Sequence, residues 1–201
     1  MNVRRILLQS GAGIGGTALL AGAMWLYSLT PKVEGTVLDP IRTTGKIGEE
    51  VRSHDFSVRV EKVEAARSLV SGLSFDRRPP VRTDGIYLVV RFRATSHREP
   101  LQLRTAELET PGGYTFQEGP RATALSTGAQ PTFQPMIWTP GTFVFELPEK
   151  RVEGARLVVG PGGLLPQLSA EAEIDLGLTR TRAKALVGAA ADRYRIRTAG
   201  S

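Results

Sequence analysis

His54 and His97 are the only histidines in the 201-residue sequence, and histidine is the side chain best suited to acid–base work near neutral pH. A Ser–His–acid triad would need one of them. A histidine-based metal site would need further ligands at suitable spacing, and the sequence around them offers none. Each histidine lies in a segment that the pattern predicts as a turn, so we expect both to be surface residues without a catalytic role.

Pairs of carboxylates are the second chemical possibility. Glu49 and Glu50 are adjacent, and Glu171 and Glu173 are separated by one residue. Two carboxylates that converge in a cleft can act as general acid and base. We expect instead that the first pair lies on a solvated strand edge. The second pair should lie on the outward face of a strand, because alternate side chains of a strand point to opposite faces.

Two further observations argue against cofactor chemistry. The sequence has no cysteine, which excludes disulfides, thiol nucleophiles, cysteine-ligated zinc and lipid attachment through a cysteine. The glycine cluster at residues 160–163 lacks the Lys and Ser/Thr of a phosphate-binding loop and predicts a turn. We therefore expect a non-enzymatic protein without a metal or cofactor.

The first group of candidate interaction residues lies within residues 66–84. Gly72 and Pro79-Pro80 predict a long irregular loop there, because neither residue type favours regular structure. Loops of this length are commonly functional or mobile. This one places an aromatic ring beside arginines, which could contact anionic lipid headgroups, a cell-wall polymer or an acidic protein. The candidates are Phe75, Arg77, Arg78 and Arg82.

The second group lies in the basic C-terminal tail, residues 179–201. The whole chain carries a net charge of +6, and this tail holds six basic residues and one acid. Near an anionic surface each Lys or Arg gains about 1 kcal/mol, so the tail could lie against a membrane or an acidic protein. It could equally remain free in solvent. Residues 179–192 predict a short Ala-rich helix that Thr179 could cap. The candidates are Arg180, Arg182, Lys184, Arg193, Arg195 and Arg197.

The element that should position the rest of the chain is the N-terminal segment, residues 1–30. Residues 6–29 carry no charge, and a membrane-spanning helix needs about 20 such residues. Arg4-Arg5 precede this run, so the N-terminus should be cytoplasmic and the rest of the chain outside. Trp25 and Tyr27 lie near the outer end, where such rings prefer the interface. We expect a single-pass membrane anchor.

Three alternatives remain open for this segment and its role. Ala21-Gly22-Ala23 is a possible cleavage site, in which case the protein is secreted. The segment could also be a buried helix of a soluble protein. Its glycines would allow close packing against another membrane helix, as in an accessory or assembly subunit of a membrane complex. A location outside the cell argues against nucleic acid as a partner.

The body of the chain shows the period-two alternation of half-buried strands. It is clearest at Phe56–Val60 and over residues 85–95, and its phase changes at Lys62-Val63, which predicts a bulge or the end of a strand. Pro111-Gly112-Gly113 predicts a hairpin and Pro140-Gly141 a turn. Seven or eight short strands without helical segments between them predict an all-β fold, an antiparallel β-sandwich. We expect a stalk over residues 31–45, the sandwich over 46–178 and the tail beyond it.

Four stretches of the sandwich resemble a known family. They are FSVRV at residues 56–60, GIYLVVRF at 85–92, PGTFVFELP at 140–148 and ARLVV at 155–159. Together they resemble the immunoglobulin-like domain of actinobacterial secreted antigens and of related uncharacterised, membrane-anchored envelope proteins. The resemblance covers residues 46–178. It implies an immunoglobulin-like sandwich outside the cell and no known enzymatic site.

The sequence as a whole therefore favours a membrane-anchored cell-envelope protein whose extracytoplasmic domain binds a protein or a wall component. The accessory subunit described above is the first alternative. The second is an envelope hydrolase that uses the histidines or the carboxylate pair at 49–50.

Overall fold

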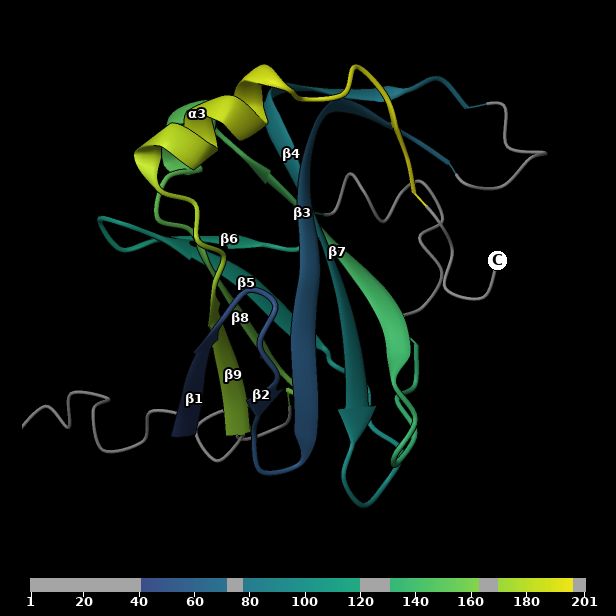
Figure 1. Ribbon diagram of the computed structural model, residues 1–201. Helices are drawn as coiled ribbons and strands as arrows, with labels where there is room; N and C mark the ends of the chain where they lie inside the picture. The colour runs from purple at the N-terminus through teal and green to yellow at the C-terminus, as the bar shows by residue number, and fades with distance from the viewer. Residues whose placement is uncertain (1–40, 72–77, 120–130, 163–169, 197–201) are drawn as a thin grey trace, which may run out of the picture. The chain divides into compact units, whose positions relative to one another are not determined.

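The protein was analysed as a computed structural model, which describes residues 41–71, 78–119, 131–162 and 170–196. These residues form two β-sheets, with one short helix at the upper end in the view of Figure 1. The elements are β1 (Ile41–Lys46), β2 (Val51–Arg52), β3 (Phe56–Val70), β4 (Val81–Ser96), β5 (Thr105–Thr110), β6 (Tyr114–Gln117), β7 (Thr139–Leu147), a 3-10 turn (Glu149–Arg151), β8 (Arg156–Gly160), β9 (Ala170–Asp175), α3 (Arg180–Gly188) and β10 (Tyr194–Arg195).

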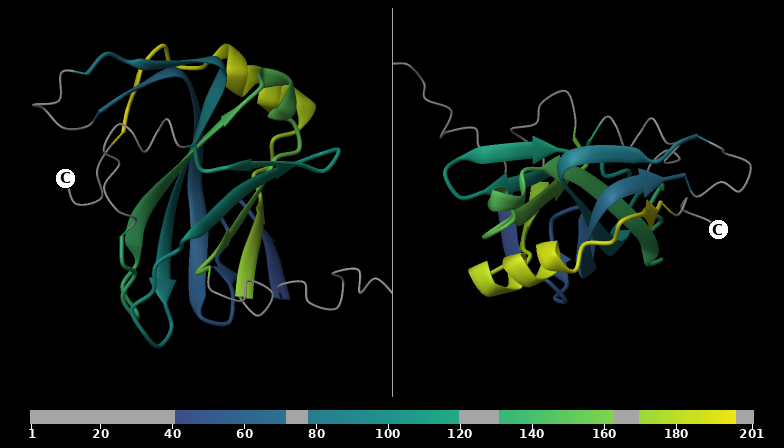
Figure 2. Two further views of the ribbon diagram at one scale, coloured as in Figure 1. Left: turned by 180° about the vertical axis from the view of Figure 1, so that it is seen from behind. Right: turned by 90° about the horizontal axis from the view of Figure 1, so that it is seen from above.

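The two sheets form the two layers of a β-sandwich (Figure 2). Sheet A has the strand order β1-β9-β8-β5-β6, and sheet B has the order β10-β3-β4-β7, with β2 pairing with the first part of β3. Most neighbouring strands are antiparallel, and the predicted all-β sandwich is confirmed. Two pairs differ from the prediction, because β1 lies parallel to β9 and β10 lies parallel to β3. Both join strands far apart in the sequence, so they need no crossover helix.

The main core lies between the sheets and is built from the inward-facing residues of both. Phe92 and Phe143 stack with ring centroids 4.5 Å apart, and Phe133 lies 6.0 Å from Phe92. Gly141 faces the Phe92 ring, where a Cβ would come within 2.4 Å of a ring carbon. The close approach of β7 to this ring therefore requires glycine. Pro140-Gly141 was predicted as a turn, but the structure places both residues inside β7, paired with Arg93 and Phe92.

Strands β3 and β4 are 15 and 16 residues long, much longer than the short strands predicted. They pair from Phe56 opposite Ser96 to Leu69 opposite Val81. The prediction of an irregular loop over residues 66–84 was therefore wrong at both ends, although Pro79-Pro80 do lie in the connection; Gly72 lies outside the described residues. The strands continue because Leu69 is buried in a second hydrophobic cluster on the outer side of sheet B.

The first β3–β4 register shift, between Val60 and Lys62, is a bulge that leaves Glu61 outside the pairing. This confirms the bulge and not the strand end as the cause of the predicted phase change. The predicted hairpin at Pro111-Gly112-Gly113 is also confirmed, between β5 and β6. Gly112 and Gly113 have φ of 92° and 76°, a backbone conformation that glycine adopts without steric cost.

Both ends of the described chain belong to the sandwich. Ile41–Lys46, most of it predicted as stalk, pairs in register with Ala170–Asp175. At the other end α3 confirms the predicted short helix, although Thr179 occupies the N-cap position without a side-chain hydrogen bond. Ile196 is buried and β10 pairs with Leu69 and Val70, so residues 179–196 are not a free tail. An uncovered β3 edge would offer unpaired backbone groups, and β10 covers it.

The predicted anchor, residues 1–30, lies outside the described residues. Within the described part of the chain, the structure contains no helix with the length and apolar character needed to span a bilayer.

Candidate interaction site

The loop and the C-terminal segment, predicted separately as interaction regions, meet in one groove of about 470 Å³. It lies at the upper end of sheet B, where β3 ends, β4 begins and the chain returns from α3 toward β10 (Figure 1). Its lining residues come from these three segments. They are Arg67, Ser68, Arg82, Thr83, Asp84, Gly85, Asp192 and Arg193.

Backbone hydrogen bonds hold the C-terminal wall of this groove against β3. The Arg67 N–H donates to the Ala191 carbonyl at 2.8 Å, and the Ser68 hydroxyl donates to the Asp192 carbonyl at 2.5 Å. The register of β3 against β4 shifts between Ala66 and Ser68, at the level of these bonds. The irregularity in β3 and the docking of the C-terminal segment therefore coincide, which fixes Arg193 beside the strand.

The groove carries an excess of positive charge. Its three arginines face two aspartates, and Arg67 is engaged by Glu149, with Nη1 and Oε1 3.0 Å apart. Arg82 and Arg193 are exposed, and neither forms an ion pair with any residue that the structure describes. Two guanidinium groups from distant parts of the sequence are thus available to a carboxylate or phosphate, the anions that Arg binds best.

The remaining sequence-predicted residues divide into three groups. Phe75, Arg77 and Arg197 lie outside the described residues. Arg78 and Arg195 are exposed, in the β3–β4 connection and in β10, but do not line the groove. The basic residues of α3 are exposed but do not line the groove. These are Arg180, Arg182 and Lys184.

His97 forms a hydrogen-bonded pair that sequence reasoning missed. Its Nε2 lies 3.0 Å from the Ser57 hydroxyl, and its Nδ1 lies 3.0 Å from the His54 carbonyl. A carbonyl only accepts, so Nδ1 donates and Nε2 of the neutral ring accepts the Ser57 proton. The pair resembles part of a Ser–His triad, but the group at Nδ1 is a backbone carbonyl and not a carboxylate. The register of β3 and β4, invisible in the sequence, brings the two side chains together.

Burial determines what this pair can do. Ser57 is only 2% exposed and lies within β3, so its hydroxyl has no room for a substrate carbonyl. The bonds of His97 to Ser57 and His54 instead tie the turn before β3 to the end of β4. His54 is exposed as predicted, and its Nε2 lies 3.7 Å from Asp55.

The outer face of sheet A is a network of paired charges. Glu171 and Glu173 face outward as predicted, alternating with buried residues of β9. Arg42 contacts Glu109 at 2.9 Å and Glu171 at 3.1 Å, and Arg156 contacts Glu173 at 3.0 Å. Glu49 and Glu50 are exposed, and Glu49 accepts a hydrogen bond from the Lys46 N–H at 3.1 Å.

The pKa values on this face follow from burial and from neighbouring charges. Burial raises the pKa of the Glu171 carboxyl; Arg42 acts in the opposite direction, and Glu107 and Glu109 raise it further. Burial acts to lower the pKa of Arg42, but its bonds and charge interactions with Glu109 and Glu171 outweigh this and raise it. Arg42 therefore stays charged, and the fold favours the protonated form of Glu171 more than water does.

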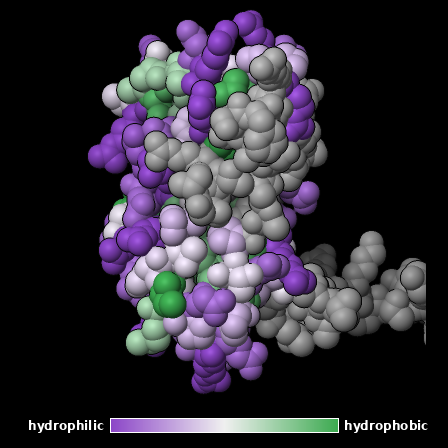
Figure 3. All heavy atoms as spheres, turned by 90° about the vertical axis from the view of Figure 1, so that its right-hand side faces the viewer, coloured by the Kyte–Doolittle hydropathy of each residue, from purple (hydrophilic) through white to green (hydrophobic). Residues whose placement is uncertain are grey.

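The outer face of sheet B differs, because its lower half carries arginines without acidic partners. Arg59, Arg91 and Arg93 are exposed, and none of them forms an ion pair within the described part of the chain. The Arg59 guanidinium lies 5.7 Å from the centre of the Trp138 ring, and Arg93 donates to the Trp138 carbonyl at 3.1 Å. Figure 3 shows the side of the molecule on which β7 lies, with hydrophobic residues at its upper end and a small hydrophobic area low on it, set among hydrophilic residues.

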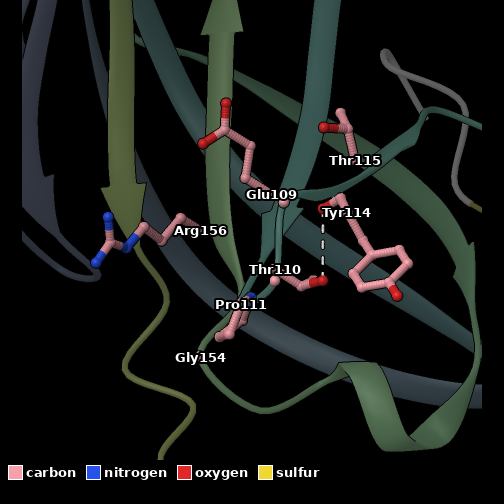
Figure 4. A pocket seen from close by; sticks show the side chains of 9 residues that line it. Glu109, Thr110, Pro111, Tyr114, Thr115, Gly154 and Arg156 are labelled. Carbon is pink, nitrogen blue, oxygen red and sulfur yellow. Dashed lines mark hydrogen bonds between the residues drawn. The ribbon is translucent and has the colours of Figure 1, made fainter.

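A second depression, of about 490 Å³, lies at the β5–β6 hairpin (Figure 4). The Thr110 hydroxyl donates to the Tyr114 carbonyl at 3.4 Å, and the Arg151 guanidinium lies 3.6 Å from the centre of the Tyr114 ring. In Figure 4 the Glu109 and Arg156 side chains point away from Tyr114. The depression therefore lacks the converging groups that a catalytic or ligand site needs.

A comparison of the sequence with protein-family descriptions and with curated proteins finds no match.

Solved structures with a similar arrangement share little sequence with this chain. An uncharacterised β-sandwich protein from Clostridium difficile has 12% identity and a TM-score of 0.41, covering 68% of this chain and 95% of its own. The yjhA protein from Bacillus subtilis has 13% identity and a TM-score of 0.45, covering 65% and 99%. The secreted protein MPT63 from Mycobacterium tuberculosis has 14% identity and a TM-score of 0.42, covering 68% and 97%. The β-sandwich assignment rests on the two sheets described above.

Proposed function

We propose that this chain is a non-enzymatic, membrane-anchored protein of the cell envelope whose sandwich lies outside the membrane and binds an acidic protein or an anionic wall polymer. In this proposal residues 1–30 form the anchor, with the N-terminus in the cytoplasm. The sandwich is an immunoglobulin-like domain of the kind found in actinobacterial secreted antigens.

The observation that carries this proposal is the meeting of Arg82 and Arg193 in one groove. More than one hundred positions separate them in the sequence, and the docking of the C-terminal segment on β3 brings them together. Surface charges that are left without partners are commonly found where a charged partner binds, since complementary charges speed and orient association.

The position of the groove in the domain suits an anchored protein. β1 begins at the lower end of the sandwich, and the groove lies at the upper end (Figures 1 and 2). An anchor attached ahead of Ile41 would leave the upper end free to meet a partner.

The groove can be tested with the full-length chain, carrying a C-terminal tag, crosslinked and captured from membranes of its native host. Replacement of both groove residues, Arg82→Glu with Arg193→Glu, should abolish capture of the partner seen with the wild type, because the anion then meets two carboxylates. The matched control is Arg98→Glu with Arg104→Glu, the same change of charge at exposed positions outside the groove. Equal capture by all three proteins would rule out the groove as the binding site.

Topology is tested separately in intact cells. A C-terminal tag on the wild-type chain should be digested by protease added outside the cell, and the chain should remain in the membrane fraction. A protected tag would contradict the proposed orientation, and a chain found wholly in the medium would show that the anchor is cleaved.

A further inference from the structure

A tight turn at Gln134–Ile137 presents two large apolar side chains to solvent. Met136 is 87% exposed and Ile137 is 59% exposed. The turn is held in place, because the Ile137 N–H donates to the Gln134 carbonyl at 3.3 Å and the Met136 N–H to the Ser96 carbonyl at 3.4 Å. The Thr95 hydroxyl also donates to the Gln134 carbonyl, at 3.1 Å. These two apolar groups therefore project from a fixed backbone.

The backbone at Met136 is in a conformation that favours glycine. Its φ is 65°, the only positive φ of a non-glycine residue in the described part of the chain. Pro135 and Met136 occupy the second and third positions of the turn, and a positive φ at the third position is the type II pattern, where Gly or Asn is preferred. A methionine in a backbone conformation that favours glycine is locally strained, and such strain is commonly found at functional sites.

The arginines on the strands beside the turn are placed where they lower the stability of the fold. Arg59 lies directly opposite Arg93 on neighbouring strands. Lys62 lies opposite Arg91, and its ammonium group is paired with Glu64 at 2.7 Å. Like charges in such cross-strand positions destabilise a sheet. Arg59 and Arg93 both contact Trp138, which directly follows the apolar turn. The apolar side chains of Met136 and Ile137 suit the acyl chains of a bilayer, and Trp138 suits the amphipathic interface above them. The two arginines suit the lipid phosphate groups.

The position of this surface in the domain favours a bilayer as the occupant. The turn lies beside Ser96, where β4 ends, and Ile41, 81% exposed, begins β1 at the same lower end (Figures 1 and 2). Residues 31–40 separate Ile41 from the predicted anchor, and a chain of that length reaches at most about 36 Å even when fully extended. An anchored sandwich is therefore always within reach of the membrane that holds it.

We infer that Met136, Ile137 and Trp138, with Arg59 and Arg93, form a second membrane contact that rests on the surface of an anionic phospholipid bilayer. The inference builds on the proposed membrane anchor. It adds a fixed orientation, in which the lower end of the sandwich faces the lipid and the basic groove faces away. An acidic protein is the less suitable occupant, because Met136 and Ile137 project singly and do not line a groove.

Tryptophan fluorescence tests this contact directly, because Trp25 and Trp138 are the only tryptophans. The full-length Trp25→Phe chain is placed in nanodiscs whose lipids carry bromine near the headgroup end of the acyl chain. Bromine quenches only a ring that lies close to the lipid. We expect Trp138 to be quenched in discs containing phosphatidylglycerol and about twofold less in phosphatidylcholine alone, since each arginine gains energy near anionic lipid.

Two variants separate the apolar and the charged contributions. Met136→Gly with Ile137→Thr removes the apolar tip and gives the turn its preferred glycine, so the protein should fold as well as the wild type and lose the quenching. Arg59→Gln with Arg93→Gln should reduce quenching in phosphatidylglycerol to the level in phosphatidylcholine. The matched control, Arg180→Gln with Lys184→Gln on α3 at the upper end, should leave quenching unchanged.

The complementary chain, Trp138→Phe with Trp25 retained, reports on the anchor alone. Quenching of Trp25 without any quenching of Trp138 would overturn the membrane contact while supporting the anchor. Quenching of Trp138 but not of Trp25 would support the contact and contradict the anchor. Quenching of Trp138 that persists in both the tip and the arginine variants would also overturn the inference.

Discussion

The outer faces of the two sheets differ in how their charged side chains are paired. On sheet A, outward-facing acids and bases alternate across neighbouring strands, and Arg42 alone contacts Glu109, Glu171 and Glu173. On sheet B, arginine faces arginine at Arg59 and Arg93, and the described residues place no carboxylate against either. Sheet A neutralises its own charge, and sheet B leaves positive charge available.

The upper half of the sheet B face differs again, because it is buried. Tyr87, Val89 and Val144 point outward from the sandwich core and form a second cluster with Ile196 near the C-terminus. One face of one sheet therefore contains a covered part and a charged, open part. The face of sheet A therefore contributes to the fold, and in the membrane contact inferred above the lower half of sheet B carries its charge for the lipid at some cost in stability.

Removal of the covered cluster should have the largest effect. Tyr87→Ala leaves a large cavity beneath the C-terminal segment and should lower the free energy of unfolding by about 3 kcal/mol. Val158→Ala, at a buried outward-facing position of sheet A, removes far less volume and should cost about 1 kcal/mol. Urea unfolding of both variants measures the difference, and equal losses would contradict the larger contribution assigned to the second cluster.

Disruption of the sheet A network should have an intermediate effect. Arg42→Ala leaves three carboxylates close together without their shared cation, and we expect a loss of about 1 kcal/mol, which high salt should diminish. Thermal unfolding at low and high salt measures it. Arg91→Thr on sheet B is the matched change and should cost nothing, because Arg91 faces another cation. A similar loss of stability for both variants would show that the charges on the two faces contribute equally to the fold.

Reversal of one charge on sheet B should stabilise the protein slightly. Arg91→Glu places an opposite charge across from Lys62, which already pairs with Glu64, and should raise the free energy of unfolding by about 0.5 kcal/mol. The same variant should weaken the contact with anionic lipid in the nanodisc experiment. Gain of stability with loss of binding is the expected signature of a functional surface, and a loss of stability would contradict the cost assigned to the like-charge pairs.

The smallest expected effect concerns pH. The pKa of Glu171 is raised in the fold, so the stability that its protonated form contributes is present below the ordinary carboxyl pKa and is lost as the pH rises through the raised value. Glu171→Gln should remove this part of the pH dependence and change stability at neutral pH by only a few tenths of a kcal/mol. Melting temperatures of variant and wild type from about pH 4 to about pH 7 test it. If the melting temperatures of variant and wild type changed with pH in the same way, the raised pKa of Glu171 would be contradicted.

Local patterns predicted the strands and turns well. Alternation located Phe56–Val60 and the central part of β4, and glycines located the β5–β6 hairpin, because these signals depend only on neighbouring residues. The same signals misled where tertiary contacts overrode them. Pro140-Gly141 lies inside β7 because the Phe92 ring needs the space above Gly141.

The candidate residues were predicted only in part. Their charge identified Arg82 and Arg193 as candidates, but nothing in the sequence predicted that the two lie close together. Their proximity depends on the pairing of β10 with β3. Trp138 and Met136 gave no signal, since a tryptophan beside apolar residues is usual in a core. Met136 is exposed and Trp138 is half-buried beside it, and only the packed structure reveals this.

The basic C-terminal region shows which properties follow from the sequence alone and which depend on the fold. By itself the sequence determined the all-β class, a near-neutral body, a strongly basic C-terminus and an uncharged N-terminal stretch long enough for a membrane. These follow from composition and short-range periodicity. The tertiary structure decided that most of this region is docked on β3, that its Arg193 meets Arg82 in one groove, and which charges are paired. Each of these depends on contacts between residues far apart in the chain, and local periodicity carries no information about them.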